Sequence, residues 1–442
     1  MSTKSFAGLL GLALLGAFTV PRSFGQGLGN SPYSRLGLGD TPATSGGIRQ
    51  QSMGGVGLAA PNGQHINDLN PALVYYTSRT TFEIGVTGQY KEISNRLASQ
   101  KDGSVNLGYI SMALPISKRW ALSLGLRPYS SVDYSNQLTE AVPGEDELRS
   151  IKQYEGKGGL TQVYLAQGVQ VAKGLTLGLT SAYTFGSIDH EAKSTLYTEE
   201  GGVENATTTV INDHLYYSDF TFRLGAHYRV PLNEKLNLNA GGTYAFSSKL
   251  DGTHDQTLLR EDIEGRAIES NAVLSGQKGY ATLPATAQFG LSLDNNKTWS
   301  VSLDAGHSKW SEFTNFSTFN ATPLHNTFRV ASGGEITPDP ASVDSYFKRI
   351  TYRLGVSVEQ MPYRPAGQVL YDRALSWGFT LPVPTSSPLE AAGVNLGFTV
   401  GIRGNKDANS ELPQGGVIQE RYVRAQLGFS LNNRWFIKRR LE

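Results

Sequence analysis

Short segments in which apolar and polar residues alternate recur from Thr80 to Asn432, and they limit the possible folds more than any other feature. The clearest segment is 394–403, with the sequence VNLGFTVGIR. Its apolar positions are Val394, Leu396, Phe398, Val400 and Ile402, and its other positions are Asn395, Gly397, Thr399, Gly401 and Arg403. Because successive side chains of a strand point to opposite faces, this segment would have one apolar and one polar side. Many such units separated by turns are typical of a transmembrane β-barrel.

The number of these segments predicts an all-β fold, namely a transmembrane antiparallel β-barrel of about 14 strands. The segments begin with 80–90, 105–115, 120–127, 160–171, 175–188, 215–231 and 236–246, and continue with 281–293, 299–309, 326–338, 348–361, 371–383, 393–403 and 416–432. The weakest is 326–338, where only Phe328 and Val330 mark an apolar face. An even number of strands places both ends of the barrel in the periplasm.

The connections alternate in length, which supports the same architecture. Tight turns are expected at 117–119, 172–174, 233–235 and 294–297. Between them lie long polar stretches, which we expect to be outer loops, at 132–159, 189–214 and 247–280. Short periplasmic turns and long extracellular loops are the usual asymmetry of such barrels.

The N-terminal residues 1–25 are predicted to be a secretory signal peptide, with Lys4 before an apolar core and a small-x-small cleavage site at 23–25. No other stretch has the roughly 18 or more apolar residues that a membrane helix needs. The combination predicts a bacterial outer-membrane protein, with a soluble periplasmic or secreted β protein as the alternative. The domains expected are the signal peptide (1–25), an N-terminal hatch or plug (26–79) and the barrel (80–442).

Residues 26–79 lack sustained alternation and cannot form a core of their own, so they are either a disordered leader or a plug inside another structure. Almost every predicted strand has a glycine near the middle of its inner face. These are Gly85, Gly125, Gly168, Gly178, Gly225, Gly241, Gly290, Gly306, Gly355, Gly378, Gly397 and Gly428. Glycines at such positions indicate either close approach of another backbone, for which 26–79 is the candidate, or bending of the barrel wall.

Charged residues share this inner face. They are Glu83, Arg127, Asp219, Arg223, Asp304, Arg353, Glu359 and Arg424. In lipid each would cost a few kcal/mol near the bilayer midplane. Inside a plugged lumen they can pair with one another and with the plug, so we expect structural ion pairs rather than ligand contacts for most of them.

Several stretches together resemble the FadL-like outer-membrane transport proteins. NDLNPAL at 67–73 resembles the Asn-Pro-Ala motif of that family before its first strand. The paired segments 283–293 and 299–313, with Trp310-Ser311 at the corner, resemble two of its adjacent strands. YRLGV at 352–356 and LSWGFTLPVP at 375–384 resemble its late strands. The resemblance covers residues 50–432.

This resemblance implies a barrel whose N-terminal segment forms a hatch and which admits long-chain fatty acids or other hydrophobic molecules. Asn70, Pro71 and Ala72 would fix the junction between hatch and first strand, although an ordinary Asn-Pro turn explains them equally. The family has a kink in its third strand that opens the wall sideways. Pro128 is the candidate for that kink because it donates no ladder hydrogen bond, or it merely ends the strand.

The opening SPYSRLGLGD at 31–40 and the ending WFIKRRLE at 435–442 resemble a Bacteroidota subgroup. Its PorV-like relatives serve type 9 secretion, so a scaffold or shuttle for a secretion complex is the main alternative to a passive channel. A channel for hydrophobic molecules predicts apolar residues inside the outer half of the barrel, with Phe313, Phe316 and Phe319, or Leu258 and Leu259, as contributors. A small-solute porin would instead need an open aqueous lumen.

Other classes of function find little support. The seven histidines have no pair at metal-ligand spacing, and the chain has no cysteine. Ser218 and His227 would lie roughly 30 Å apart on one strand, too far to react. We therefore predict no enzyme, no metal and no cofactor. The net charge of +1 gives no case for nucleic acid. The expected partners are a hydrophobic ligand, outer-membrane lipids and, for the alternative, secretion-system proteins, with the protein itself a monomer.

Overall fold

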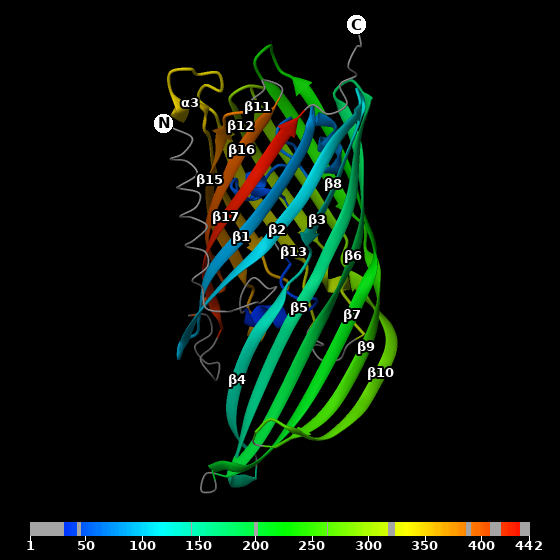
Figure 1. Ribbon diagram of the computed structural model, residues 1–442, viewed down its shortest axis with the longest axis vertical. Helices are drawn as coiled ribbons and strands as arrows, with labels where there is room; N and C mark the ends of the chain where they lie inside the picture. The colour runs from blue at the N-terminus through cyan, green and yellow to red at the C-terminus, as the bar shows by residue number, and fades with distance from the viewer. Residues whose placement is uncertain are drawn as a thin grey trace.

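The computed structural model describes residues 31–41, 46–142, 144–198, 202–262, 264–316, 323–385, 390–406 and 417–433. Within them, 17 strand segments form one antiparallel sheet, which closes through pairing of the first with the last (Figure 1). The segments are β1 (Thr80–Ser94), β2 (Ser99–Ser117), β3 (Trp120–Pro128), β4 (Val132–Val142), β5 (Glu145–Ala172), β6 (Leu175–Thr198), β7 (Gly202–Pro231), β8 (Asn237–Ala245), β9 (Ser248–Glu261), β10 (Ala267–Leu283), β11 (Thr286–Asp294), β12 (Trp299–Ser308), β13 (Thr327–Ile336), β14 (Thr351–Gln360), β15 (Tyr371–Val383), β16 (Ala391–Arg403) and β17 (Gln419–Asn433). The predicted signal peptide lies outside the described residues.

Three pairs of segments are halves of one interrupted strand. β3 and β4 both pair with β5, β8 and β9 both pair with β7, and β10 and β11 pair with β9 and β8 in turn. The barrel therefore has 14 strands, as the sequence predicts. The predicted strand 281–293 is in fact interrupted at Pro284 and Ala285, between β10 and β11.

The helical elements are all short. They are η1 (Pro32–Arg35), α2 (Ile48–Gln51), η2 (Pro71–Tyr76), η3 (Trp310–Glu312), α3 (Tyr346–Arg349) and η4 (Pro365–Gly367). Among the described residues, no helix has both the length and the apolar character needed to cross a membrane.

Alternation along each strand sorts side chains between the two faces of the wall. In β16 the polar positions Asn395, Thr399 and Arg403 are buried inside the barrel. On the outer face of β17, which pairs with β16, Leu427, Phe429 and Leu431 are 44–46% exposed. This outward apolar surface is what lipid requires, and the inward polar side chains must find partners inside the barrel.

The prediction of long outer loops at 132–159, 189–214 and 247–280 is wrong. These stretches are mostly strand and extend one side of the barrel far beyond the rest (Figure 1). The extension lies beyond the apolar belt, so its outer face carries polar residues. Examples that stand opposite one another across β5, β6, β7 and β9 are Lys157, Asp189, His214 and Asp255. Without an apolar face the alternation disappears from the sequence, although the backbone ladder continues.

Residues 46–79, here called the luminal segment, lie inside the barrel and end where β1 begins (Figure 1). Ten of the twelve inner-face glycines face this segment so closely that an added Cβ would lie within 3.2 Å of its atoms; they are Gly85, Gly168, Gly178, Gly225, Gly241, Gly290, Gly355, Gly378, Gly397 and Gly428. The other two, Gly125 and Gly306, face wall side chains, Tyr164 and Gln288. Close approach of the segment therefore accounts for most of these glycines.

The backbone of the luminal segment approaches glycines on well-separated strands of the wall. A Cβ on Gly178 would lie 2.3 Å from the amide nitrogen of Ala72, and one on Gly355 would lie 2.1 Å from the carbonyl carbon of Met53. A backbone atom cannot swing away as a side-chain end can. Any larger residue at these positions would therefore move the luminal segment or the wall.

Two neighbouring glycines of β8 provide a matched test. We expect Gly241→Ala to destabilise the protein by about 1–3 kcal/mol, because its methyl group would overlap the Leu58 carbonyl, as overpacking does elsewhere. Gly242→Ala should be tolerated, since its nearest neighbour would be 3.5 Å away. The midpoint of heat-induced unfolding, followed by gel mobility, measures both. Equal midpoints for the two variants would contradict the proposed contact.

Candidate functional site

The sequence directs the luminal segment into a helical turn at its end. Asn70 caps η2 by accepting a hydrogen bond from the Ala72 amide at 3.0 Å, and Pro71 occupies the first position of the turn. The Asn70 amide group also donates to the carbonyls of Leu58 at 2.8 Å and Ala226 at 3.0 Å. The side chain of Asn70 thus joins two parts of the luminal segment to the wall strand β7.

Four of the eight predicted inner charges bind the luminal segment directly. The guanidinium of Arg127 pairs with Asp68 at 2.6 Å. One carboxylate oxygen of Asp304 accepts from the amides of Gly57 at 2.7 Å and Leu58 at 3.0 Å.

Glu83 of the wall likewise pairs with His65 of the segment at 2.8 Å. Arg223 donates to the carbonyls of Asp68 and Leu69 at 3.3 and 3.4 Å. These four wall charges therefore hold the luminal segment at three places between residues 57 and 69, with Arg127 and Arg223 both binding at Asp68.

The other four predicted charges reach the segment indirectly or not at all. Arg353 pairs with Glu335 at 2.9 Å, and Glu335 in turn pairs with Arg49 of the segment at 2.6 Å. Arg424 donates to Gln89 at 3.1 Å, both on the wall. The remaining two are Glu359, which lies 3.8 Å from Arg329, and Asp219, which accepts from the next amide in its own strand.

Sequence reasoning missed the partners on the segment itself, chiefly Arg49, His65 and Asp68. All lie in the stretch without alternation, where no periodicity marks an inward direction. Their charges in an otherwise Gly-, Ser- and Asn-rich segment were the one available signal. Glu335 was missed too, because it ends the weakest strand.

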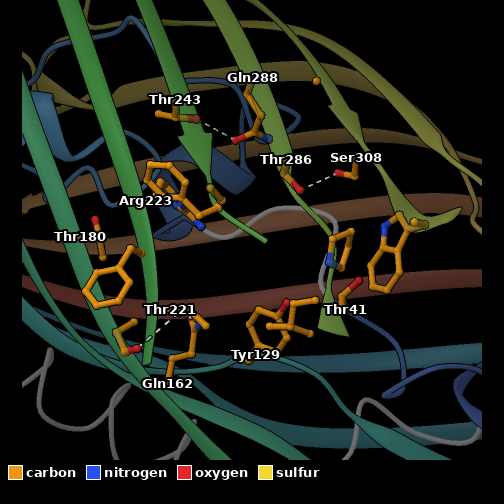
Figure 2. Close-up of a pocket in the computed structure, with 18 of the residues that line it drawn as sticks. Thr41, Tyr129, Gln162, Thr180, Thr221, Arg223, Thr243, Thr286, Gln288 and Ser308 are labelled. Atoms are coloured by element: carbon orange, nitrogen blue, oxygen red, sulfur yellow. Dashed lines mark hydrogen bonds between the residues drawn. The ribbon is translucent and has the colours of Figure 1, made fainter. Parts of the chain in front are cut away.

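A cavity of about 190 Å³ lies in the lumen beside these contacts. Figure 2 shows that hydroxyl and amide side chains surround it, among them Thr180, Thr221, Thr243, Thr286 and Gln288. The cavity also reaches Pro128 and Tyr129, where the third strand is interrupted. Its lining is mixed in polarity, so it does not form a purely apolar binding site.

The wall is incompletely paired at this interruption. β3 ends at Pro128, and its pairing with β2 extends only to Leu126 opposite Ile110. β4 then starts at Val132 and pairs with β5, whereas the first half of β2, residues 99–109, pairs with β1 alone. The exposed Pro128 thus stands at the point where the barrel wall loses one of its ladders.

Residues 31–41, here called the stopper, pair with the β4 edge at this gap. Asp40 and Ser131 form an isolated antiparallel bridge with N–O distances of 2.8 and 3.0 Å. The Ser31 amide donates to the Asp133 carbonyl at 2.7 Å. Gly39 is required here because its φ is +97° and a Cβ would lie 2.5 Å from the Ser131 carbonyl oxygen.

A buried arginine attaches the stopper to the opposite side of the gap. Arg403 of β16 pairs with Asp40 at 2.6 Å and with Asp372 of β15 at 3.2 Å. Tyr33 of the stopper stacks on Tyr363 with ring centroids 4.6 Å apart. The Ser31 hydroxyl also donates to Glu420 at 2.6 Å and the Tyr33 hydroxyl to the Ile418 carbonyl at 2.7 Å, so the stopper is bound on both sides, to β4 and to the late strands.

An apolar cluster, here called the outer cluster, occupies the outer half of the barrel next to the gap. Its buried members are Leu38, Val132, Tyr134, Leu160, Ile188, Leu215, Tyr217, Leu250, Ala281 and Leu283. Phe313 and Phe316 pack against it, as expected for apolar loop residues inside the outer barrel. Leu258 and Leu259 lie on β9 outside this cluster, and Phe319 lies outside the described residues.

The ring of Phe316 rests on two glycines of adjacent strands. A Cβ on Gly279 would lie 2.3 Å from the ring, and one on Gly252 would lie 2.9 Å from it. The ring also meets Tyr217 edge-on at 5.8 Å. Phe316 thus fills a recess in the outer cluster and is held there by packing alone.

We expect Asn70→Ala to loosen the luminal segment, because it removes the partners of the buried Leu58 carbonyl and of the Ala72 amide, at about 1–3 kcal/mol for each group. Adding Pro71→Ala should increase the effect. Limited proteolysis between residues 46 and 79 measures it. As a control, Asn233→Ala removes an exposed asparagine that likewise accepts from backbone amides, at Lys235 and Leu236. Unchanged folding and unchanged permeability in Asn70→Ala/Pro71→Ala would refute the junction role.

Comparison with known proteins places the chain in a family. The BamG family model matches residues 10–442. Among solved structures, the CymD monoaromatic hydrocarbon channel is 16% identical with a TM-score of 0.56, and covers 90% of this chain and 100% of its own. A Pseudomonas aeruginosa FadL homologue is 15% identical with a TM-score of 0.57, covering 90% and 99%. The Pseudomonas putida toluene transporter TodX is 15% identical with a TM-score of 0.52, covering 89% and 99%.

None of the curated proteins matches the chain. At these identities the solved structures establish the fold, and the family model establishes membership over nearly the whole chain. The protein is therefore an outer-membrane β-barrel that belongs to the BamG family and has the fold of the FadL-like transport proteins.

Proposed function

We propose that the protein is a passive outer-membrane channel for hydrophobic molecules such as long-chain fatty acids. The observation that carries this proposal is the outer cluster, an apolar site within the barrel that lies directly beside the incompletely paired wall at β3 and β4. A ligand would enter among the outer strands, displace Phe316 and Phe313 from the outer cluster, and leave through the wall.

The lumen beneath the outer cluster argues against a route straight through the barrel. The cavity there has threonine, glutamine and arginine side chains among its lining, and the luminal segment next to it is held by buried ion pairs. An apolar molecule would have to break these contacts and leave buried charges without partners, which is costly. The gap at Tyr129–Ser131 lies beside the outer cluster. Once the stopper has left it, the gap would open towards the membrane, where an apolar molecule is stable.

In this proposal the stopper controls the exit. It must leave the β4 edge, which breaks the Asp40–Ser131 bridge and the hydrogen bonds of Ser31 and Ser34 with Asp133. Pro128 is the proposed kink that keeps β4 from rejoining β2. Asn70, Pro71 and Ala72 are the proposed junction of a hatch that stays in place while the stopper moves. The signal peptide at 1–25, the Bacteroidota origin and the monomeric state remain predictions.

The similar solved structures support this class of substrate, since they include a monoaromatic hydrocarbon channel and a toluene transporter. Those substrates belong to those proteins. For this chain, the apolar side chains of the outer cluster support the same general class of substrate.

A reversible tether tests the exit. The chain has no cysteine, so Asp40→Cys/Ser131→Cys introduces one defined pair at bridged positions, where Cα atoms lie within disulfide range. We expect oxidation to stop transfer of a fluorescent long-chain fatty acid into cells, because the stopper cannot leave β4, and reduction to restore it.

Each single cysteine variant is the control, since both remove the same side chains without forming a bond. Asp40→Cys also removes an ion pair with Arg403, so its own transfer rate sets the reference. Transfer that continues at the reference rate after complete oxidation would show that the ligand does not pass the stopper.

A second candidate, a PorV-like scaffold or shuttle for a secretion complex, is favoured by the long outer extension. There β4 and β10 form the two edges of an open sheet, and β10 carries exposed apolar residues at Ile268, Val273 and Tyr280. Unpaired edges of this kind can accept a strand from another polypeptide.

Native mass spectrometry of the protein taken from its own outer membrane in mild detergent separates the two candidates. The channel predicts an apolar small molecule bound at one per barrel. The scaffold predicts bound polypeptides and an empty barrel. Substituting proline at Val273 would block strand addition at β10, so a polypeptide that stays bound to Val273→Pro would not be held by that edge.

A further inference from the structure

The outer wall carries two arginines in one row of side chains, at the boundary of its apolar belt nearest the long strand extension. Pairing across four adjacent strands places Val358, Arg373, Ile402 and Arg421 side by side on the lipid-facing surface of β14, β15, β16 and β17. Arg373 and Arg421 are both exposed and separated by Ile402, so their strands lie about 10 Å apart. Neither arginine has an ion-pair partner among the residues that the structure describes.

The rows below this one are apolar. The next row is Val356, Leu375, Val400, Val423 and Tyr90. Along β17 the outward positions continue as Ala425, Leu427, Phe429 and Leu431 to the end of the strand. These positions match an apolar band about 25 Å tall, so Arg373 and Arg421 stand at the level of the lipid headgroups.

That level belongs to the outer leaflet. The arginines lie towards the end of the barrel that bears the long strand extension, opposite the short turns such as 117–119. Short turns are periplasmic in such barrels, and the long extension is extracellular.

A groove of about 640 Å³ runs down the wall from the two arginines. It is lined by apolar side chains of the next row together with Val358 and Ile402, and its rim carries Arg373, Arg421 and Glu92. Glu92 stands opposite Arg421 on β1, and the two make no ion pair within the described contacts. The groove therefore brings an apolar surface on two adjacent rows together with two guanidinium groups at its rim.

We propose that this groove binds one phosphate-bearing lipid of the outer leaflet. Guanidinium groups pair with phosphate oxygens through two parallel hydrogen bonds, and an acyl chain would cover the apolar rows below. The location in the lipid-facing belt favours a lipid over a protein or a soluble anion. This site faces away from the lumen and is independent of the route proposed above.

The test uses full-length protein in mild detergent and lipid A, a bis-phosphorylated outer-leaflet lipid, as the probe. Native mass spectrometry should show one lipid A bound to the unaltered protein. Arg373→Gln/Arg421→Gln should weaken this binding by about tenfold or more, because each arginine near an anionic headgroup contributes to binding. Lipid A from which both phosphates have been removed should bind as weakly to the unaltered protein as lipid A does to this variant.

Lys118→Gln/Arg119→Gln is the matched control, since it removes two exposed basic residues from a periplasmic turn and should leave lipid A binding unchanged. Thermal unfolding of both variants checks that they fold. Equal lipid A binding in Arg373→Gln/Arg421→Gln and the unaltered protein would overturn the proposal. Inorganic phosphate that binds as tightly as lipid A would also overturn it, because the groove would then have no part in recognition.

Discussion

The structure depends on the contact between the backbone of the luminal segment and the glycines of the barrel wall. At Gly178, Gly241 and Gly355 the segment comes so near that a single methyl group would overlap its backbone atoms. This approach lets a 14-stranded barrel be filled by a peptide of modest length. It also fixes that peptide at several heights, so that much of the polar inner face of the wall packs against the segment rather than lining an open pore.

Filling the lumen determines what the charges do. Arg127, Asp304 and Glu83 are buried, and each bonds to an atom of the segment. Separating a buried ion pair leaves a buried charge without a partner, which is strongly destabilising. The luminal segment is therefore the part least suited to move. The stopper is also held by a buried ion pair, that of Arg403 with Asp40, but it closes a place where the wall has already lost one of its ladders. Motion during transport is therefore expected at the side of the barrel and not along its axis.

Much of the barrel could be predicted from the sequence, because lipid outside and polar groups inside force a period of two on every strand. The same reasoning failed for the extension beyond the membrane, where Asp189 and His214 face water and no apolar face remains to mark a strand. It gave the inward direction of Arg127 but not its partner Asp68, since a segment without periodicity does not reveal which side chain meets which wall. The bridge of Asp40 to Ser131 joins residues far apart in sequence, and nothing local predicts such a register.

Ion conductance through single barrels in a planar bilayer tests the central claim most directly. A barrel filled by the luminal segment and sealed by buried ion pairs should pass no steady current, and the transport of apolar molecules would need none. A stable open conductance of the size expected for a water-filled porin would contradict the account, because it would require an aqueous path where the luminal segment is placed.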